Sequence, residues 1–513
     1  MSGRRKDYDR TAALEIELRR LYSDPGDFAE AGRLRGSGSL RNPLLRRQVD
    51  RLYLACLENQ IPADLMEPMV RRGAEVENIF NTHRGKISGR PVSDNEIKEI
   101  LRRDDRSGTR REAWEAGKQV GVEVEPLLRE VARLRNQAAR RLGFRDYYLL
   151  SITLQEQTEP EIAALFDELA ELTGPPFRTA KGEIDAGLAR RFGVAAGDLM
   201  PWHYADPFFQ EAPPANGFDL HAPYRGRDVA ALAREFYRRI GLPVDVVLDR
   251  SDLHEKPGKE QHAFCIDIDR AGDVRVLANL RDNEQWMETM LHELGHAAYD
   301  LFIDRSLPYL LREPAHIFTT EAVAMFFGRR SKDGDFARLL LGLPAAQAEE
   351  YGRAGRRMLR LDRLVFCRWT QVMVRFERAL YADPEADLNR VWWDLVEHHQ
   401  GLRRPAGGGR ADWASKIHIA TRPVYYHNYM LGELMASQIQ SHLERSVAHK
   451  QTGEAERPSF VDVPEAGALL KEELLRPGAS LHWRDLLARA AGGPLSARSF
   501  VSQLVDPCIS ASG

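Results

Sequence analysis

The segment 290–300, M-L-H-E-L-G-H-A-A-Y-D, constrains the fold of this chain more than any other. His292 and His296 are four residues apart, so on a helix their side chains project from one face, one turn from each other. Upstream, Asp282-Asn283-Glu284-Gln285 resembles a capping box, which predicts where such a helix begins. A stripe of apolar residues would anchor the helix in a core: Met287, Met290, Leu291, Leu294 and Ala298. The segment therefore predicts a buried helix with two imidazoles on one side.

Two imidazoles at this spacing can bind one zinc ion. Glu293, next to the first imidazole, could then take a proton from the water that attacks a substrate. The alternative interpretation is a helix with two ordinary core histidines. Because catalytic zinc usually takes three protein ligands and leaves one position open, the sequence must offer a third ligand.

The segment 314–328, P-A-H-I-F-T-T-E-A-V-A-M-F-F-G, contains two candidates for the third ligand. Glu321 lies in an apolar run, with Thr319 or Thr320 as the expected start of a helix, and a buried carboxylate is costly without a partner. A zinc ion would be that partner, and a salt bridge to a nearby arginine is the other interpretation. His316 is the rival ligand, although a proline two residues before it would keep it outside the helix. The residues alone leave this choice open.

Most of the remaining chain has helical patterns. Residues 110–143 carry apolar positions at near-helical spacing, and 158–172 opens with a threonine N-cap. Strand patterns are few, and 261–268 and 274–280 alternate on either side of a D-R-A-G-D turn, which predicts a hairpin. Stretches rich in Gly, Pro or polar residues predict loops at 207–218, 402–411 and 450–458.

We therefore expect a mainly α fold, a large helical body of two subdomains around a deep cleft, with a small antiparallel β hairpin beside the zinc helix. No stretch marks a linker, so residues 1–513 are interpreted as a single domain. Its approximate halves would be 1–250, a helical subdomain that forms the lid and cleft, and 251–513, a zinc-binding catalytic subdomain.

Composition excludes several classes of protein. The chain has 73 Lys+Arg and 76 Asp+Glu, a net charge of −3, which argues against a nucleic-acid binder that depends on overall charge. No apolar run approaches the ~20 residues of a membrane helix, and the charged N-terminal segment lacks the apolar core of a secretory signal. Four cysteines without C-x-x-C spacing exclude a cysteine zinc site and disfavour a disulfide scaffold: Cys56, Cys265, Cys367 and Cys508. We expect a cytoplasmic protein.

Further motifs make a family resemblance specific. An H-E-L-G-H helix followed 25 residues later by Glu321 looks like the zinc peptidases with a glutamate ligand, the gluzincins. Residues 391–405, V-W-W-D-L-V-E-H-H-Q-G-L-R-R-P, and 416–418, K-I-H, resemble stretches of one such family, as does the following P-V-Y-Y-H-N-Y. The strand at 261–268 is similar to a strand of that family at His262 and Ala263. In this order the motifs resemble the angiotensin-converting enzyme family, the peptidyl-dipeptidase A family, in the form of a bacterial-type cytoplasmic member.

The resemblance implies a single peptidase domain that hydrolyses short peptides and releases C-terminal dipeptides. One zinc per chain would be held by His292, His296 and Glu321, with Glu293 as the proton acceptor. The implied oxyanion donors are His418 and Tyr429, and the implied peptide-binding residues are His262 and Ala263 on the strand and Lys416, Tyr425 and Tyr426 at the peptide's terminal carboxylate. Short peptides are the expected partners, with neither nucleic acid nor a membrane.

Departures from the family pattern are also visible. Gln261 replaces a cysteine of the family's strand, so that family disulfide cannot form, and Val396 and Asn428 stand where the animal enzymes carry chloride-binding arginines. Met325 replaces an aspartate, which leaves the partner of His292 open.

The same residues are compatible with alternative functions. One is an oligoendopeptidase of the thimet type or a metallocarboxypeptidase with the same zinc site, and another is a degenerate binding protein that keeps the fold. The alternative interpretation of His418 and Tyr429 is buried aromatic residues with satisfied hydrogen bonds, and that of Lys416 is a solvated surface lysine.

Overall fold

The computed structural model describes residues 10, 14, 17–213, 218–406, 411–447 and 460–504. The described chain is mainly helical, as the sequence predicts, with two small two-stranded antiparallel sheets. The predicted loop 450–458 lies outside the described residues, as do parts of the other two predicted loops, 214–217 and 407–410.

The chain divides into two compact units that interleave along the sequence. Unit 1 comprises Met1–Gln60, Gly217–Leu359 and Leu431–Gln503, and unit 2 comprises Ile61–Asn216, Arg360–Met430 and Leu504–Gly513. The expected single peptidase domain with halves 1–250 and 251–513 stays a prediction.

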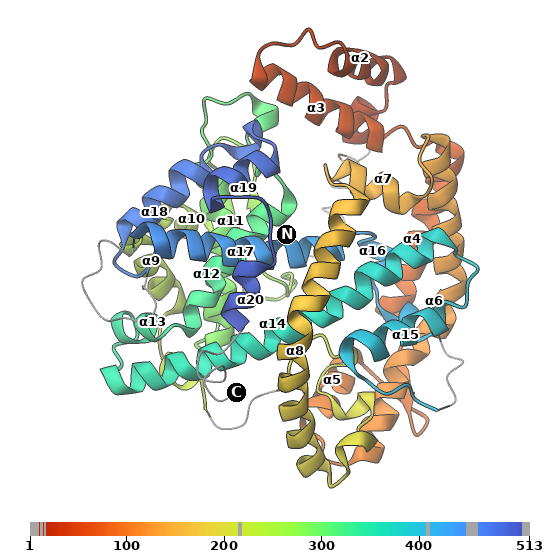
Figure 1. Ribbon diagram of the computed structural model, residues 1–513, viewed down its shortest axis with the longest axis vertical. Coiled ribbons are helices and arrows are strands. Elements are labelled where there is room, and N and C mark those ends of the chain that lie inside the picture. The colour runs from red at the N-terminus through yellow and green to blue at the C-terminus, as the bar shows by residue number, and fades with distance from the viewer. Residues whose placement is uncertain are drawn as a thin grey trace. The chain divides into compact units, whose positions relative to one another are not determined.

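Unit 1 carries the H-E-L-G-H helix, α11, which packs against α9, α12 and a β hairpin (Figure 1). Its elements are α2 (Pro25–Gly36), α3 (Pro43–Glu58), α9 (Val229–Arg239), α10 (Asp245–Arg250), β3 (Phe264–Asp267), β4 (Val274–Leu277), α11 (Glu284–Phe302), α12 (Ile317–Gly328), α13 (Gly334–Leu339), the first part of α14 (Ala345–Ala382), most of α17 (Tyr426–Val447), α18 (Pro464–Leu470), α19 (Trp483–Ala491) and α20 (Arg498–Leu504), with short helical turns between them.

Local sequence explains where α11 and α12 begin. Asn283 caps α11, with its side chain accepting the backbone N–H of Trp286 at 2.9 Å, so the predicted helix start is confirmed. The expected start of α12 at Thr319 or Thr320 is wrong, because His316 is the N-cap and its Nδ1 accepts the N–H of Phe318 at 3.1 Å. The imidazole of His316 therefore replaces the hydroxyl or carboxylate that normally marks a helix start.

The two helices pack closely at Gly295. A Cβ atom there would lie 2.7 Å from the Cα of Ala324, so only glycine allows this approach. The predicted apolar stripe of α11 is fully buried: Met287, Met290, Leu291, Leu294 and Ala298. The core of unit 1 thus fixes the position of α11 along α12.

The predicted hairpin is confirmed, with strands shorter than expected. β3 pairs antiparallel with β4 in the register Phe264 to Leu277, and both strands contact α11. The turn is closed by Asp269, whose carboxylate accepts the backbone N–H groups of Ala271 and Asp273 at 2.8 and 3.0 Å. A small sheet therefore lies beside the H-E-L-G-H helix.

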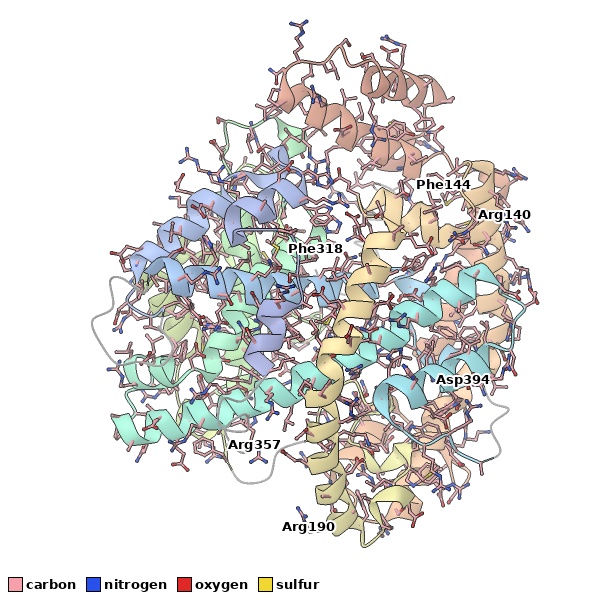
Figure 2. The ribbon with its side chains drawn as sticks, viewed as in Figure 1. Arg140, Phe144, Arg190, Phe318, Arg357 and Asp394 are labelled. Atoms are coloured by element: carbon pink, nitrogen blue, oxygen red, sulfur yellow. The ribbon has the colours of Figure 1, made fainter. Side chains whose placement is uncertain are left out.

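Unit 2 is built on long helices. Its elements are α4 (Ala63–Thr82), β1 (Gly85–Ile87), β2 (Arg90–Val92), α5 (Asp94–Arg103), α6 (Ser107–Arg141), α7 (Tyr147–Leu154), α8 (Glu159–Phe192), the remainder of α14, α15 (Leu388–Gln400), the 3₁₀ turn η6 (Asp412–Ser415) and α16 (His418–Thr421). Arg140 lies in the last turn of α6, Phe144 lies just beyond the end of that helix, and Arg190 lies in the last turn of α8 (Figure 2).

Helix α8 shows where sequence patterns hold and fail. Thr158 caps it as predicted, with its hydroxyl accepting the N–H of Glu161, but the helix runs 20 residues beyond the predicted segment 158–172. It continues through Pro175 and Pro176, although proline normally kinks or breaks a helix when it lies in the interior. The hairpin of β1 and β2 was not expected, although its S-G turn is typical of hairpins, with Ser88 and Gly89 both at positive φ.

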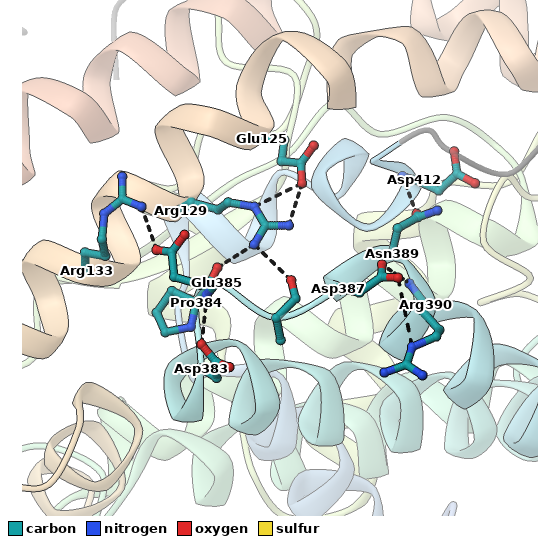
Figure 3. Close-up of polar contacts among 11 residues, drawn as sticks. Glu125, Arg129, Arg133, Asp383, Pro384, Glu385, Asp387, Asn389, Arg390 and Asp412 are labelled. Atoms are coloured by element: carbon teal, nitrogen blue, oxygen red, sulfur yellow. Dashed lines mark hydrogen bonds and ion pairs between the residues drawn. The ribbon is translucent and has the colours of Figure 1, made fainter.

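Arg129 of α6 holds the turn at 383–387, which joins α14 to α15 (Figure 3). Its guanidinium donates to two backbone carbonyls of the turn and is oriented by Glu125. Within α15, Asn389 then accepts the backbone N–H of Asp412 at 3.2 Å. These contacts tie η6 to α15 and fix the chain immediately before Lys416.

Among the described residues, no helix is both long and apolar enough to cross a membrane. The expected cytoplasmic location stays a prediction.

Candidate metal centre and peptide-binding residues

His292, His296 and Glu321 come together in unit 1. One donor atom from each side chain lies within 4.8 Å of the other two. Glu321 Oε2 is 3.8 Å from His292 Nε2 and 4.0 Å from His296 Nε2. Two zinc–ligand bonds of about 2.1 Å allow their donor atoms to be at most about 4.2 Å apart. The distances between Glu321 and each imidazole therefore fit coordination of one zinc ion.

The electrostatic environment also fits a bound cation. Burial lowers the pKa of His292 to about 4 and that of His296 to about 3, so both imidazoles are neutral, as metal ligands must be. Burial raises the pKa of Glu321 to about 7. Across the described part of the chain, no lysine or arginine forms an ion pair with Glu321, so the salt-bridge interpretation finds no partner there. A divalent cation would compensate this buried carboxylate.

A neighbouring hydroxyl orients one imidazole. His296 Nδ1 and Thr320 Oγ1 are 2.7 Å apart, which leaves Nε2 directed toward Glu321. The charges of Glu288 and Glu433 raise the pKa of His292 and so act against the shift caused by burial. His316 does not join the cluster, because it caps α12 and packs on Phe318.

Glu293 is buried beside this cluster, with 8% of its surface exposed. Burial, and next the charge of Glu321, raises the pKa of Glu293 to about 7, while a backbone hydrogen bond from Cys265 acts in the opposite direction. A carboxyl group whose pKa lies near neutrality can both accept and return a proton. His262 and Ala263, at the entrance to β3, belong to the same unit.

A second group of predicted residues lies in unit 2 around Lys416. Its ammonium donates to Gln210 Oε1 at 2.7 Å, and the Tyr426 hydroxyl is 3.5 Å from the same oxygen. Trp369 Nε1 donates to the Tyr426 hydroxyl at 2.8 Å. Lys416 is 7% exposed, and burial lowers its pKa to about 8, so it is not a solvated surface lysine.

Sequence reasoning missed Gln210. It lies in the predicted loop 207–218, where no local pattern marks a functional residue. Asp206 fixes its amide, because Gln210 Nε2 donates to Asp206 Oδ2 at 3.1 Å and so leaves Oε1 for Lys416. The burial of Lys416 could have predicted some acceptor, but not which one.

Tyr426 is part of an aromatic cluster in the same unit. Its ring contacts those of His418 and Tyr429, and Tyr429 in turn contacts Tyr425. The rings of His418 and Tyr429 each lie 5.4 Å from that of Tyr426, and the ring of Tyr425 lies 5.1 Å from that of Tyr429. Burial, and next the charge of Lys416, lowers the pKa of His418 to about 4, so its imidazole is neutral. A neutral imidazole retains one N–H that can donate a hydrogen bond.

A helical protein that brings an H-E-x-x-H pair and a glutamate of a second helix to one point has the ligand set of a catalytic zinc protein. A family model described as angiotensin-converting enzyme, peptidase family M2, matches residues 221–507, more than half of the chain. The chain therefore belongs to the angiotensin-converting enzyme family.

The curated relatives are distant. The angiotensin-converting enzyme-like protein Ace3 of Mus musculus is 24% identical over 430 residues, covering 76% of this chain and 56% of that protein. The angiotensin-converting enzyme of Rattus norvegicus is 23% identical over 437 residues, covering 77% of this chain and 32% of that enzyme. This chain thus spans between about a third and about half the length of these relatives.

Proposed function

We propose that this protein is a zinc-dependent peptidase that acts on short peptides and releases dipeptides from the C-terminus. The observation that carries the proposal is the group of His292, His296 and Glu321, with one donor atom of each within 4.8 Å of the other two, and the buried Glu293 beside it. Family membership supports the same activity.

The predicted site residues of unit 1 have two tasks in this mechanism, metal binding and proton transfer. His292, His296 and Glu321 would hold one zinc, which when bound polarises a peptide carbonyl and lowers the pKa of water. Glu293 takes the proton of the attacking water on its carboxylate and passes it to the leaving amine. The Cys265 N–H keeps that carboxylate oriented.

The edge of β3 would bind the substrate backbone. His262 and Ala263 precede this strand, and an extended peptide that adds to a strand edge is held without regard to its side chains. The assignment of His418 and Tyr429 as donors to the oxyanion rests on the family resemblance, and the neutral state of His418 is compatible with it.

The group of Gln210, Lys416 and Tyr426 would bind the peptide's terminal carboxylate. It offers an ammonium and a phenol hydroxyl that share one amide oxygen, and a carboxylate could replace that oxygen as their acceptor. By the family resemblance, a peptide whose terminal carboxylate is bound there would be cleaved two residues from its C-terminus. This group is the basis for proposing dipeptide release rather than internal cleavage.

Replacing Lys416 with methionine should lower kcat/KM by about ten- to a hundredfold, because one charge-assisted hydrogen bond is worth roughly 1.5–3 kcal/mol. Amidating the C-terminus of the peptide should lower the kcat/KM of wild-type protein by about the same factor. For the variant acting on the amidated peptide, kcat/KM should fall little further, because the substitution and the amidation remove the same interaction. The measurement is kcat/KM for four pairs of protein and peptide, with cleavage products identified by mass. Equal rates on free and amidated peptides, with cuts at internal bonds, would support an oligoendopeptidase instead.

A further inference from the structure

We propose that Lys259 and Asn279 are positioning residues for peptide hydrolysis. Together they hold the segment 259–263, which leads into β3, in the conformation that receives the substrate backbone. The inference rests on the proposed function, because it concerns the strand edge on which a peptide would be bound. We refer to these two side chains and the backbone groups they hold as the strand clamp.

Lys259 is a buried cation whose partners are mostly backbone oxygens. Its side chain is 1% exposed, yet its ammonium donates to the carbonyls of Asp252, His254 and Ala278 at 2.9, 2.8 and 2.5 Å. It also lies 3.0 Å from the Asp252 carboxylate. Burying an ammonium is costly unless its N–H groups are satisfied, so these oxygens fix its position and it fixes theirs.

The clamp fastens a loop to the hairpin. The backbone N–H of Asp252 donates to Val276 at 3.0 Å, and that of Ala278 donates back to Asp252 at 2.9 Å, so residue 252 already pairs with the β4 edge. Lys259 lies seven residues after Asp252, at the other end of the loop. Its ammonium binds the carbonyl oxygens of both paired residues, Asp252 and Ala278. The chain therefore leaves the loop at a defined point and enters the segment 259–263.

Asn279 holds the next residues of that segment. Its side-chain Nδ2 donates to the carbonyls of Glu260 and Gln261 at 3.0 and 3.2 Å, and the residue is 4% exposed. Both acceptors come immediately before His262, the first residue expected to contact a peptide. Two buried side chains thus fix consecutive residues at the entrance to the strand.

The same strand reaches Glu293. The backbone N–H of Ile268 donates to Asp273 at 3.0 Å, so in the antiparallel ladder alternate residues turn their N–H groups away from β4. Cys265 is one of these, and its N–H bonds the Glu293 carboxylate. A shift of the strand entrance would therefore disturb peptide binding first and the orientation of Glu293 second.

Lys259→Met tests the clamp, and Lys256→Met is its matched control. Lys256 pairs with the same carboxylate of Asp252, but its side chain is 61% exposed and forms no hydrogen bond to the carbonyls held by Lys259. Both substitutions remove one positive charge and keep a side chain of similar length. We expect Lys259→Met to raise KM about tenfold or more at unchanged zinc content, with a smaller fall in kcat, and Lys256→Met to leave both within about twofold.

A purely stabilising role predicts a different pattern. Loss of folded protein would lower the apparent kcat and leave KM unchanged, so an unaltered KM in the zinc-loaded Lys259→Met protein would overturn the proposal. Asn279→Leu provides a second variant, which should raise KM in the same way.

Hydrogen exchange separates failure of this inference from failure of the proposed function. Amides of residues 260–263 should exchange at least about tenfold faster in Lys259→Met than in Lys256→Met, whether or not peptides are cleaved. Wild-type protein that cleaves no peptide would refute the proposed function, while this exchange difference would still establish the clamp. Equal exchange in both variants would overturn the clamp even in an active enzyme.

Discussion

Replacing Glu293 with glutamine should lower kcat by a factor of about 10²–10⁴, the usual contribution of general acid–base catalysis. The amide has nearly the same shape and can still accept the backbone N–H of Cys265, but it cannot take a proton from water. Zinc content and melting temperature should therefore stay near those of wild-type protein. The measurement is kcat from steady-state kinetics on one defined peptide, together with zinc analysis of the same samples.

Glu288→Gln is the matched control for this prediction. Glu288 lies on the same helix, and its ion pair with Lys332 can be lost while Lys332 remains paired with Glu284. Near-normal turnover in Glu293→Gln, with zinc bound, would contradict the assignment of Glu293 as proton acceptor. Equal losses in both variants would show that any charge change on α11 suffices.

Replacing Glu321 with glutamine should weaken zinc binding by at least about a hundredfold. Loss of a residue that merely orients a metal ligand typically costs 10–100-fold in affinity, so loss of an anionic ligand should cost more. The zinc-free variant, however, should be at least as stable as zinc-free wild-type protein. Burial raises the pKa of Glu321, and no cation within the described chain compensates its charge, so a neutral amide removes an unfavourable buried carboxylate.

These two expectations for Glu321 have opposite signs and can be measured separately. Competition with a chromogenic chelator gives the zinc affinity, and thermal unfolding of metal-free samples gives the stability. A structural salt bridge would behave differently, because its loss would destabilise the metal-free protein and leave zinc binding unchanged. That result would remove Glu321 from the metal site.

Local rules explain how much of the site could be predicted from sequence. The spacing of His292 and His296, the cap at Asn283 and the apolar stripe of α11 all depend on residues within a few turns of one helix. Glu321 is a candidate ligand because a carboxylate in an apolar run needs a partner. The family resemblance, rather than local pattern, selected it over His316.

The remaining features depend on contacts between distant segments. Gln210 contacts Lys416 across 206 residues of sequence, and nothing in a predicted loop marks such a partner. Lys259 has the sequence context of an ordinary polar loop, and only the convergence of three carbonyls shows its role. Helix α8 passes through two prolines because tertiary packing overrides local preference. The interleaving of the two units along the chain has no sequence signal at all.

The most direct test of this account is a zinc titration of the metal-free protein with a defined peptide, following products by mass. The account predicts that cleavage appears in proportion to added zinc, saturates at one zinc per chain, and yields the C-terminal dipeptide as the first product. Cleavage that persists in metal-free protein, or a fully zinc-loaded protein that leaves the peptide intact, would contradict it.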